Sequence, residues 1–205
     1  MEAANILLSR YFARVRVYFI QRVSVEYEDL VQETFARLIE ARDRYRGDAP
    51  FRVYLFTIAR NVLYSHLRSR YRIEATFDII ETDDSIADMT GRRHSSLLAE
   101  REEHRLLLDA LRQLKLSYQE LLELYYWQNL TGQELAELFG VVEATIRSRL
   151  RQAVSALRTR YQEMAAMPHH KDIEEEQVRA WLEELGLMLE QQKQAPRPSD
   201  HPRAG

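Results

Sequence analysis

The sequence predicts an all-α protein with two small helical domains, an acidic linker between them and one appended C-terminal helix. Nearly every apolar pattern recurs at the spacing of a buried helical face, and no run alternates with period two. Most glycines and prolines fall between these patterns. The 205 residues include no cysteine, which excludes disulfide bonds and thiolate metal sites.

The first domain, residues 1–72, is predicted to hold helices over 5–22, 27–42 and 52–72. The loop Gly47-Asp48-Ala49-Pro50 separates the last two helices, and Asp48 or Ala49 is expected near the helix cap.

Aromatic rings and cations gather at the third predicted helix, where such a set can stack on unpaired bases and neutralise phosphates. The alternative is that several of these rings belong to the domain core, because the apolar residues there also fit helical core spacing. The residues that suggest single-strand binding are Arg46, Phe51, Tyr54, Phe56, Arg60, Asn61, Tyr64, His66 and Arg68.

An acidic patch lies at the start of the second predicted helix. Its charges can interact with the helix dipole, which contributes about 0.3–1 kcal/mol each. They can equally form a docking surface for a basic partner, and composition does not decide between the two. The patch consists of Glu26, Glu28, Asp29, Gln32 and Glu33.

Residues 73–96 lose helical periodicity and are rich in acids, so we interpret them as the linker. The second domain, residues 97–163, begins with apolar residues on one helical face: Leu106, Leu107, Ala110, Leu111 and Leu114. A further helix is expected over 117–128.

The most informative stretch is 130–153, which predicts a short helix, a turn and a second helix. Thr131 and Glu134 have the spacing of a capping box. Gly140 can adopt the positive φ needed where the first helix ends. The second helix is predicted to bury Ile146, Leu150, Val154 and Leu157 and to turn Arg147, Ser148, Arg151 and Arg158 outward. Such a helix fits the major groove of DNA. An ordinary helical hairpin with a solvated arginine face is the alternative.

A last amphipathic helix is predicted within 168–193, followed by a disordered tail over 194–205. Its stripe contains Val178, Trp181, Leu182, Leu185, Met188 and Leu189. Burial of such side chains contributes roughly 1.5–3 kcal/mol each, so the helix should pack against either domain or another protein. A regulatory lid and a purely stabilising helix both remain open.

Two segments resemble bacterial extracytoplasmic-function (group IV) sigma factors of RNA polymerase. Residues 29–38 (DLVQETFARL) and 51–68 (FRVYLFTIARNVLYSHLR) are similar to sigma domain 2. Residues 111–114 (LRQL), 119–122 (QELL), 131–141 (TGQELAELFGV) and 145–150 (TIRSRL) are similar to sigma domain 4, which contains the helix-turn-helix. The resemblance covers about residues 5–160.

The resemblance implies a non-catalytic subunit that binds core RNA polymerase and promoter DNA, and it makes an anti-sigma partner plausible. It assigns clamp binding to Asp29, Leu30, Gln32, Glu33 and Phe35. It assigns minus-ten recognition and melting to Arg46, Phe51, Arg60, Asn61, Tyr64 and Arg68, and minus-thirty-five recognition to Thr145, Arg147, Ser148 and Arg151. Tyr54 and Ser65 depart from the Trp and Asp frequent in the family, which affects the expected promoter sequence more than the assignment.

Three other classes compete with a sigma factor: an enzyme, a helix-turn-helix regulator, and a protein-interaction module with a degenerate DNA surface. An enzyme is disfavoured, because the histidines lack metal-ligand spacing and no glycine-rich phosphate loop is present. No cofactor or metal is therefore expected. A helix-turn-helix regulator that binds duplex DNA without polymerase would explain 117–160 but leave the first domain unused. No signal peptide or membrane span is recognised, so a cytoplasmic location is expected.

Overall fold

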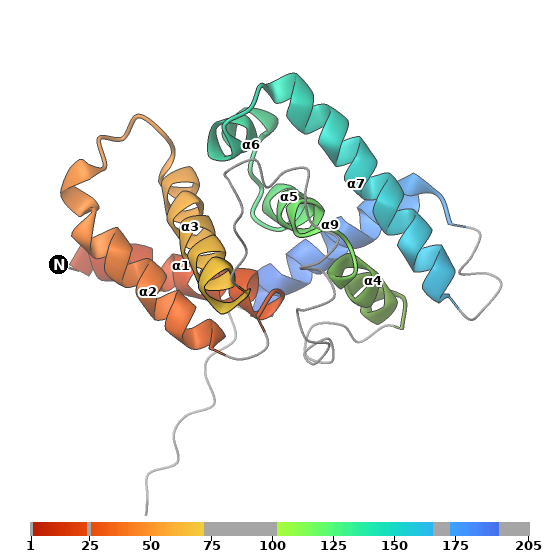
Figure 1. The fold of residues 1–205 in the computed structure, drawn as a ribbon, viewed down its shortest axis with the longest axis horizontal. Coiled ribbons are helices and arrows are strands. Elements are labelled where there is room, and N and C mark those ends of the chain that lie inside the picture. The colour runs from red at the N-terminus through yellow and green to blue at the C-terminus, as the bar shows by residue number, and fades with distance from the viewer. Residues whose placement is uncertain (1, 24–25, 72–101, 166–172, 193–205) are drawn as a thin grey trace, which may run out of the picture.

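The computed structural model describes residues 2–23, 26–71, 102–165 and 173–192. Every regular element in these ranges is helical, which confirms the all-α fold class. The predicted linker over 73–96 and the predicted tail over 194–205 lie outside the described residues. The helices form two adjacent groups, which Figure 1 shows in red to yellow and in green to cyan.

The first bundle consists of α1 (Glu2–Ile20), α2 (Tyr27–Glu40) and α3 (Phe51–Tyr71), with the short 3₁₀ helix η1 (Arg42–Arg44) after α2. Helix α2 packs against both α1 and α3. The Pro50 carbonyl accepts the first hydrogen bonds of α3, from the backbone N–H groups of Val53 and Tyr54, so the helix begins directly after Pro50, with Ala49 one residue before it.

The second bundle consists of α4 (Glu102–Arg112), α5 (Leu116–Tyr126), α6 (Gly132–Phe139) and α7 (Glu143–Met164). The predicted capping box is confirmed, because the Glu134 amide donates to Thr131 Oγ1 at 3.2 Å and the Thr131 amide donates to Glu134 Oε2 at 2.8 Å. Gly140 ends α6 with a φ of 66°. These two local signals mark the start and the end of α6, the first helix of the helix-turn-helix.

The appended helix α9 (Glu175–Gln192) packs on the second bundle, across α4, α5 and α7 (Figure 1). Val178, Leu182 and Leu185 are buried there. The Trp127 indole N–H donates to the Leu182 carbonyl at 3.1 Å, which fixes the register of α9 against the end of α5. Val178, Leu182 and Leu185 of the predicted apolar stripe therefore pack within the chain.

Arg158 differs from its predicted outward position. Its Nε donates to the carbonyl of Ile173 at 2.6 Å, and its guanidinium lies 3.9 Å from the Glu174 carboxylate. The chain leading into α9 returns along α7 and uses this arginine, so Arg158 belongs to the docking of α9.

Replacing Gly186 with valine is expected to lower the free energy of unfolding by about 1–3 kcal/mol, the usual cost of overpacking. A Cβ atom at this position would lie 2.8 Å from the carbonyl oxygen of Tyr126, a backbone atom that cannot rotate away. Urea unfolding of the full chain measures the change. Leu187→Val on the same helix is the control, because Leu187 is 59% exposed. Equal stability of the two variants would contradict the close packing of α9.

Candidate nucleic-acid interface

The loop before α3 displays Arg46 on a braced backbone. The Tyr45 hydroxyl donates to the Ala49 carbonyl at 2.8 Å, and the Tyr45 and Tyr54 rings lie 5.0 Å apart. Gly47 adopts a φ of 80°, which glycine tolerates without strain. Arg46 itself is exposed. The loop thus holds a cation outward at the start of α3.

Phe51 is half-buried at the first position of α3. Its ring lies 5.3 Å from Tyr11 and 5.9 Å from Tyr45. The aromatic cluster predicted from the sequence therefore belongs partly to the core of the first bundle, as the alternative interpretation had it.

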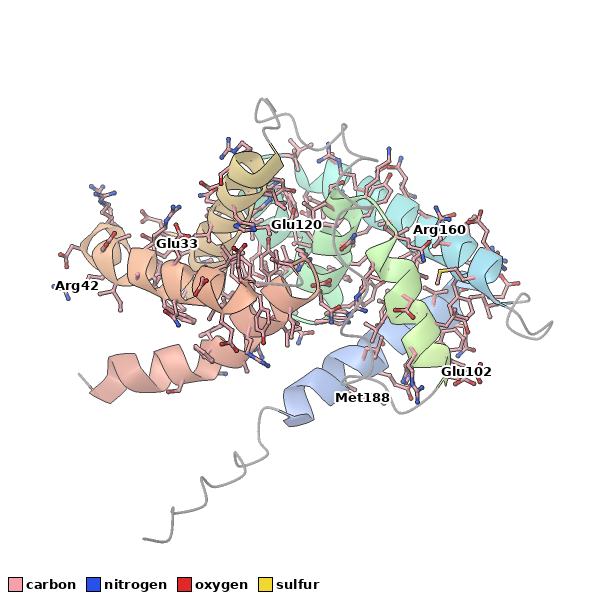
Figure 2. The ribbon with its side chains drawn as sticks, turned by 60° about the horizontal axis from the view of Figure 1, so that its bottom comes forward. Glu33, Arg42, Glu102, Glu120, Arg160 and Met188 are labelled. Atoms are coloured by element: carbon pink, nitrogen blue, oxygen red, sulfur yellow. The ribbon has the colours of Figure 1, made fainter. Side chains whose placement is uncertain are left out.

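The second bundle covers part of the predicted DNA face of α3. The Tyr64 hydroxyl donates to Glu120 of α5 at 2.8 Å, and Arg60 Nε donates to the same carboxylate at 3.3 Å. The Tyr18 hydroxyl of α1 also donates to Glu120, which is completely buried. Figure 2 shows Glu120 between the two bundles. Arg60 also lies over the Phe139 ring, with 5.0 Å between its guanidinium carbon and the ring centroid.

The rest of that face is not covered in the same way. Asn61 is exposed, and Arg68 is half-buried with its Nε donating to the Tyr64 carbonyl at 3.3 Å. The structure therefore places the predicted residues of α3 in two environments, with Arg60 and Tyr64 at the bundle contact and Asn61 facing solvent.

Three further contacts join the bundles, and all use charged or polar side chains. Arg22 Nη1 donates to Glu123 Oε2 at 2.9 Å, with both side chains almost fully buried. Arg52 of α3 donates two hydrogen bonds of 2.8 Å each to the Glu134 carboxylate, so this member of the α6 capping box also contacts α3. Arg112 donates to Gln21 Oε1 at 2.9 and 3.1 Å. We call these contacts, together with those of Glu120, the interbundle cluster.

Sequence reasoning did not identify Glu120 and Glu123 as functional residues. Both follow the helical pattern of α5 among leucines, where a carboxylate ordinarily marks a solvent position. Their cationic partners, Arg60 and Arg22, lie 60 and 101 positions away in the sequence, and no local spacing reveals such a pair.

The interbundle cluster is expected to make the contact between bundles sensitive to pH. Burial raises the pKa of Glu123 to about 7, against the opposing effect of Arg22. A carboxyl that reaches water on separation returns toward its ordinary pKa near 4.5. The packed arrangement therefore binds the Glu123 proton more tightly than the separated one. The stabilisation of the packed arrangement by Glu123 is complete below pH 4.5 and is lost as the pH rises toward 7.

The fraction of packed molecules is thus expected to be higher at pH 5.5 than at pH 7.5, by at most about tenfold per pKa unit for one group. The other groups facing Glu123 are Arg22, Arg112 and Glu120. Energy transfer between dyes on the two bundles measures the fraction, and Glu123→Gln should flatten the profile. An unchanged profile in that variant would exclude Glu123 as the titrating group.

The helix-turn-helix presents its arginines to solvent. Arg147 and Arg151 are exposed on α7, while Thr145 and Ser148 are half-buried beside them. Arg147 pairs with Glu143 one turn earlier at 3.0 Å, an exposed pair that holds the side chain only weakly. Ile146, Val154 and Leu157 are buried on the opposite side, as predicted, and Leu150 is half-buried.

The acidic face of α2 lies on the first bundle. Asp29, Gln32 and Glu33 are exposed on neighbouring turns, and Figure 2 shows Glu33 on α2 away from Glu120. Leu30, in contrast, is buried in the core. Phe35 is half-buried, with its ring stacked 5.8 Å from Phe12 of α1.

The same surface carries apolar residues that the sequence reasoning missed. Phe12 is 46% exposed and its ring stacks on Phe35. Ile39 is 50% exposed and lies one turn after Phe35 on α2. Ile39 follows Phe35 at the i,i+4 spacing of one helical face, and this signal was available from the sequence.

Comparison with known proteins decides the family. Residues 7–73 match Sigma-70 region 2, and residues 104–157 match Sigma-70 region 4. The ECF RNA polymerase sigma factor SigL of Mycobacterium tuberculosis is 31% identical over 145 residues, which cover 69% of this chain and 77% of that protein. The chain belongs to the extracytoplasmic-function (ECF) sigma factor family.

Other relatives agree with this sigma factor assignment. The ECF sigma factor BldN of Streptomyces coelicolor is 32% identical over 76% of this chain and 59% of its own length. A sigma factor RpoE from Bartonella quintana, solved in complex with the anti-sigma factor NepR, matches with a TM-score of 0.63 at 21% identity. That match covers 80% of this chain and 100% of RpoE, and it shows a shared fold.

The protein is therefore an alternative sigma factor that directs transcription by RNA polymerase, and sigma factors are regulatory proteins. The independent helix-turn-helix regulator is disfavoured, because the match to region 2 accounts for the first bundle. In the described part of the sigma factor, no helix has the length and apolar character to cross a membrane. The described residues also contain no group of three His, Asp or Glu side chains placed to hold a metal ion.

Proposed function

We propose that the exposed half of α7 reads the minus-thirty-five element of the promoter. The observation that carries this proposal is the exposure of Arg147 and Arg151 on α7, the second helix of a helix-turn-helix whose first helix, α6, has a complete capping box. Arginine pairs with guanine through two hydrogen bonds in the major groove, which is wide enough for a helix. Thr145 and Ser148 lie beside the arginines and complete the set.

The first bundle takes the minus-ten element in this proposal. Arg46 and Asn61 are already exposed, and Phe51 lies between them at the start of α3. Arg60, Tyr64 and Arg68 extend the same surface along the helix. Aromatic rings hold unstacked bases and arginines neutralise phosphates, which suits a strand that must leave the duplex.

Promoter capture then requires the two bundles to separate, because Arg60 and Tyr64 are held by Glu120 in the packed arrangement. Residues 73–96 serve as the linker between the domains at 1–72 and 97–163. Its acidic composition lets it follow the path of template and RNA without being held by DNA phosphates. The packed arrangement is the form that cannot yet bind a complete promoter.

The polymerase clamp is proposed to bind the acidic face of α2. Asp29, Gln32 and Glu33 supply polar contacts, and Phe35 supplies a partly exposed ring. Leu30 supports this face from the core. Apolar contacts surrounded by polar ones are typical of the centre and rim of protein interfaces.

The protein acts in the cytoplasm with polymerase and has no catalytic activity or cofactor of its own. An anti-sigma factor is a further partner, supported by the fold shared with RpoE, which was solved with the anti-sigma factor NepR.

Run-off transcription tests the proposed function. Core polymerase is incubated with and without the full chain on a fragment that contains the region upstream of the protein's own gene. A discrete start site that depends on the protein is the expected result. Absence of both a start site and core binding would favour the helix-turn-helix regulator that acts without polymerase.

A further inference from the structure

An open cleft of about 440 Å³ lies beside the exposed half of α7. Arg147 and Arg151 line it from α7, Arg179 lines it from α9, and Tyr125 and Tyr126 line it from the end of α5. No carboxylate is among the lining residues. Ala144, Leu150 and Val154 of α7 form its apolar part, so the cleft combines arginine, tyrosine and apolar side chains of the helix-turn-helix, the end of α5 and the appended helix. We call it the α7–α9 cleft.

Arg179 is only loosely held by the rest of the molecule. Its side chain is 40% exposed, and its one ion pair within the described residues is with Glu175 on the preceding turn, at 3.5 Å. Its Nε is buried and lacks a hydrogen-bond partner among the described residues. An exposed pair of this kind is weak and exchanges readily for a stronger anion.

The shape and chemistry of the α7–α9 cleft fit a phosphate backbone. Arginine and tyrosine side chains are typical phosphate contacts in protein–DNA complexes. A helix that enters the major groove lies between two sugar–phosphate backbones, so cations at its flank meet phosphates while its outer face meets bases. Tyr125 is 38% exposed and adds a hydroxyl donor at the same flank. A small-molecule site would instead be expected to enclose its ligand.

We infer that Arg179 of the appended helix binds a DNA phosphate next to the minus-thirty-five element. The inference rests on the proposed promoter recognition by α7. It extends the DNA interface beyond residues 104–157, which are the ones that match Sigma-70 region 4. Helix α9 then has a positive role in promoter binding, in addition to its packing on the second bundle.

Arg179→Gln tests the inference in the full chain bound to core polymerase. Glutamine keeps most of the side-chain stem, which preserves the packing beside Tyr126. Binding to the fragment upstream of the protein's own gene is followed by fluorescence anisotropy over a series of KCl concentrations. The slope of log K against log salt should become shallower by about one, the change expected for one lost phosphate contact. Arg179→Lys should recover most of the slope.

Arg160→Gln is the matched control. Its side chain is 43% exposed and pairs with Glu163 at 3.0 Å, so its environment resembles that of Arg179. Figure 2 shows it on the part of α7 far from Glu120. The control should leave the slope unchanged. The same result for Arg179→Gln, with Arg147→Ala weakening binding, would overturn the inference alone. Failure of the unaltered holoenzyme to bind or initiate would overturn the proposed function and the inference together.

Discussion

Replacing Glu120 with alanine is expected to shift the molecule from the packed to the separated arrangement of its bundles. The Glu120 carboxylate accepts hydrogen bonds from Tyr18, Arg60 and Tyr64, all three of which belong to the first bundle. Its loss would leave Arg60, with 17% of its side chain exposed, without its carboxylate partner and with only the Phe139 ring beside it in the second bundle. Removing one member of a buried ion pair typically costs about 3–5 kcal/mol. That cost applies only while the bundles are in contact.

The absence of cysteine makes this measurement direct. Cysteines introduced at Arg42 and Arg160, which Figure 2 shows on different bundles, would carry a donor and an acceptor dye. Energy transfer should fall in Glu120→Ala and stay high in Glu137→Ala, a control at an exposed position of α6. Unchanged transfer in Glu120→Ala would show that the cluster does not hold the bundles together.

The second large effect is expected at the promoter. Arg147→Ala and Arg151→Ala should each weaken holoenzyme binding by about 1–3 kcal/mol, the usual contribution of a specific base contact. The loss should be greatest on the cognate sequence and small on unrelated DNA, because a base contact carries specificity. Both side chains are exposed, so folding should be unaffected.

Competition binding on cognate and scrambled fragments measures this specificity, and thermal unfolding of each variant confirms that it folds. Arg160→Ala on the same helix is the control. An equal loss on both fragments would reassign the two arginines to phosphate contacts. No loss on either fragment would contradict recognition by α7.

The sequence predicted the helix-turn-helix well because its determinants are local. Thr131 and Glu134 are three positions apart, and Gly140 acts through its own backbone. The buried positions of α7 follow from helical periodicity alone. Family resemblance then supplied the function, which no periodicity could show.

The contacts between distant segments were not predictable in this way. The sequence predicted Arg60 and Tyr64 to be available for DNA, but both donate hydrogen bonds to Glu120, about sixty positions later. Arg158 was predicted to point outward, but it donates a hydrogen bond to the carbonyl of Ile173 in the segment before α9. Each case depends on how preformed helices pack, and such packing is set by the whole molecule.

The interbundle cluster also has a consequence for how the protein moves through a genome. Arg22, Arg52 and Arg60 are neutralised by the protein's own carboxylates while the bundles are packed. A chain in this state offers fewer cations to random DNA, where attraction depends almost entirely on the number of phosphates neutralised. The carboxylates of Glu120, Glu123 and Glu134 thus compete with DNA phosphates for these arginines. We therefore expect weaker non-specific DNA binding by the packed subunit, which leaves more of the polymerase-free protein available to bind polymerase.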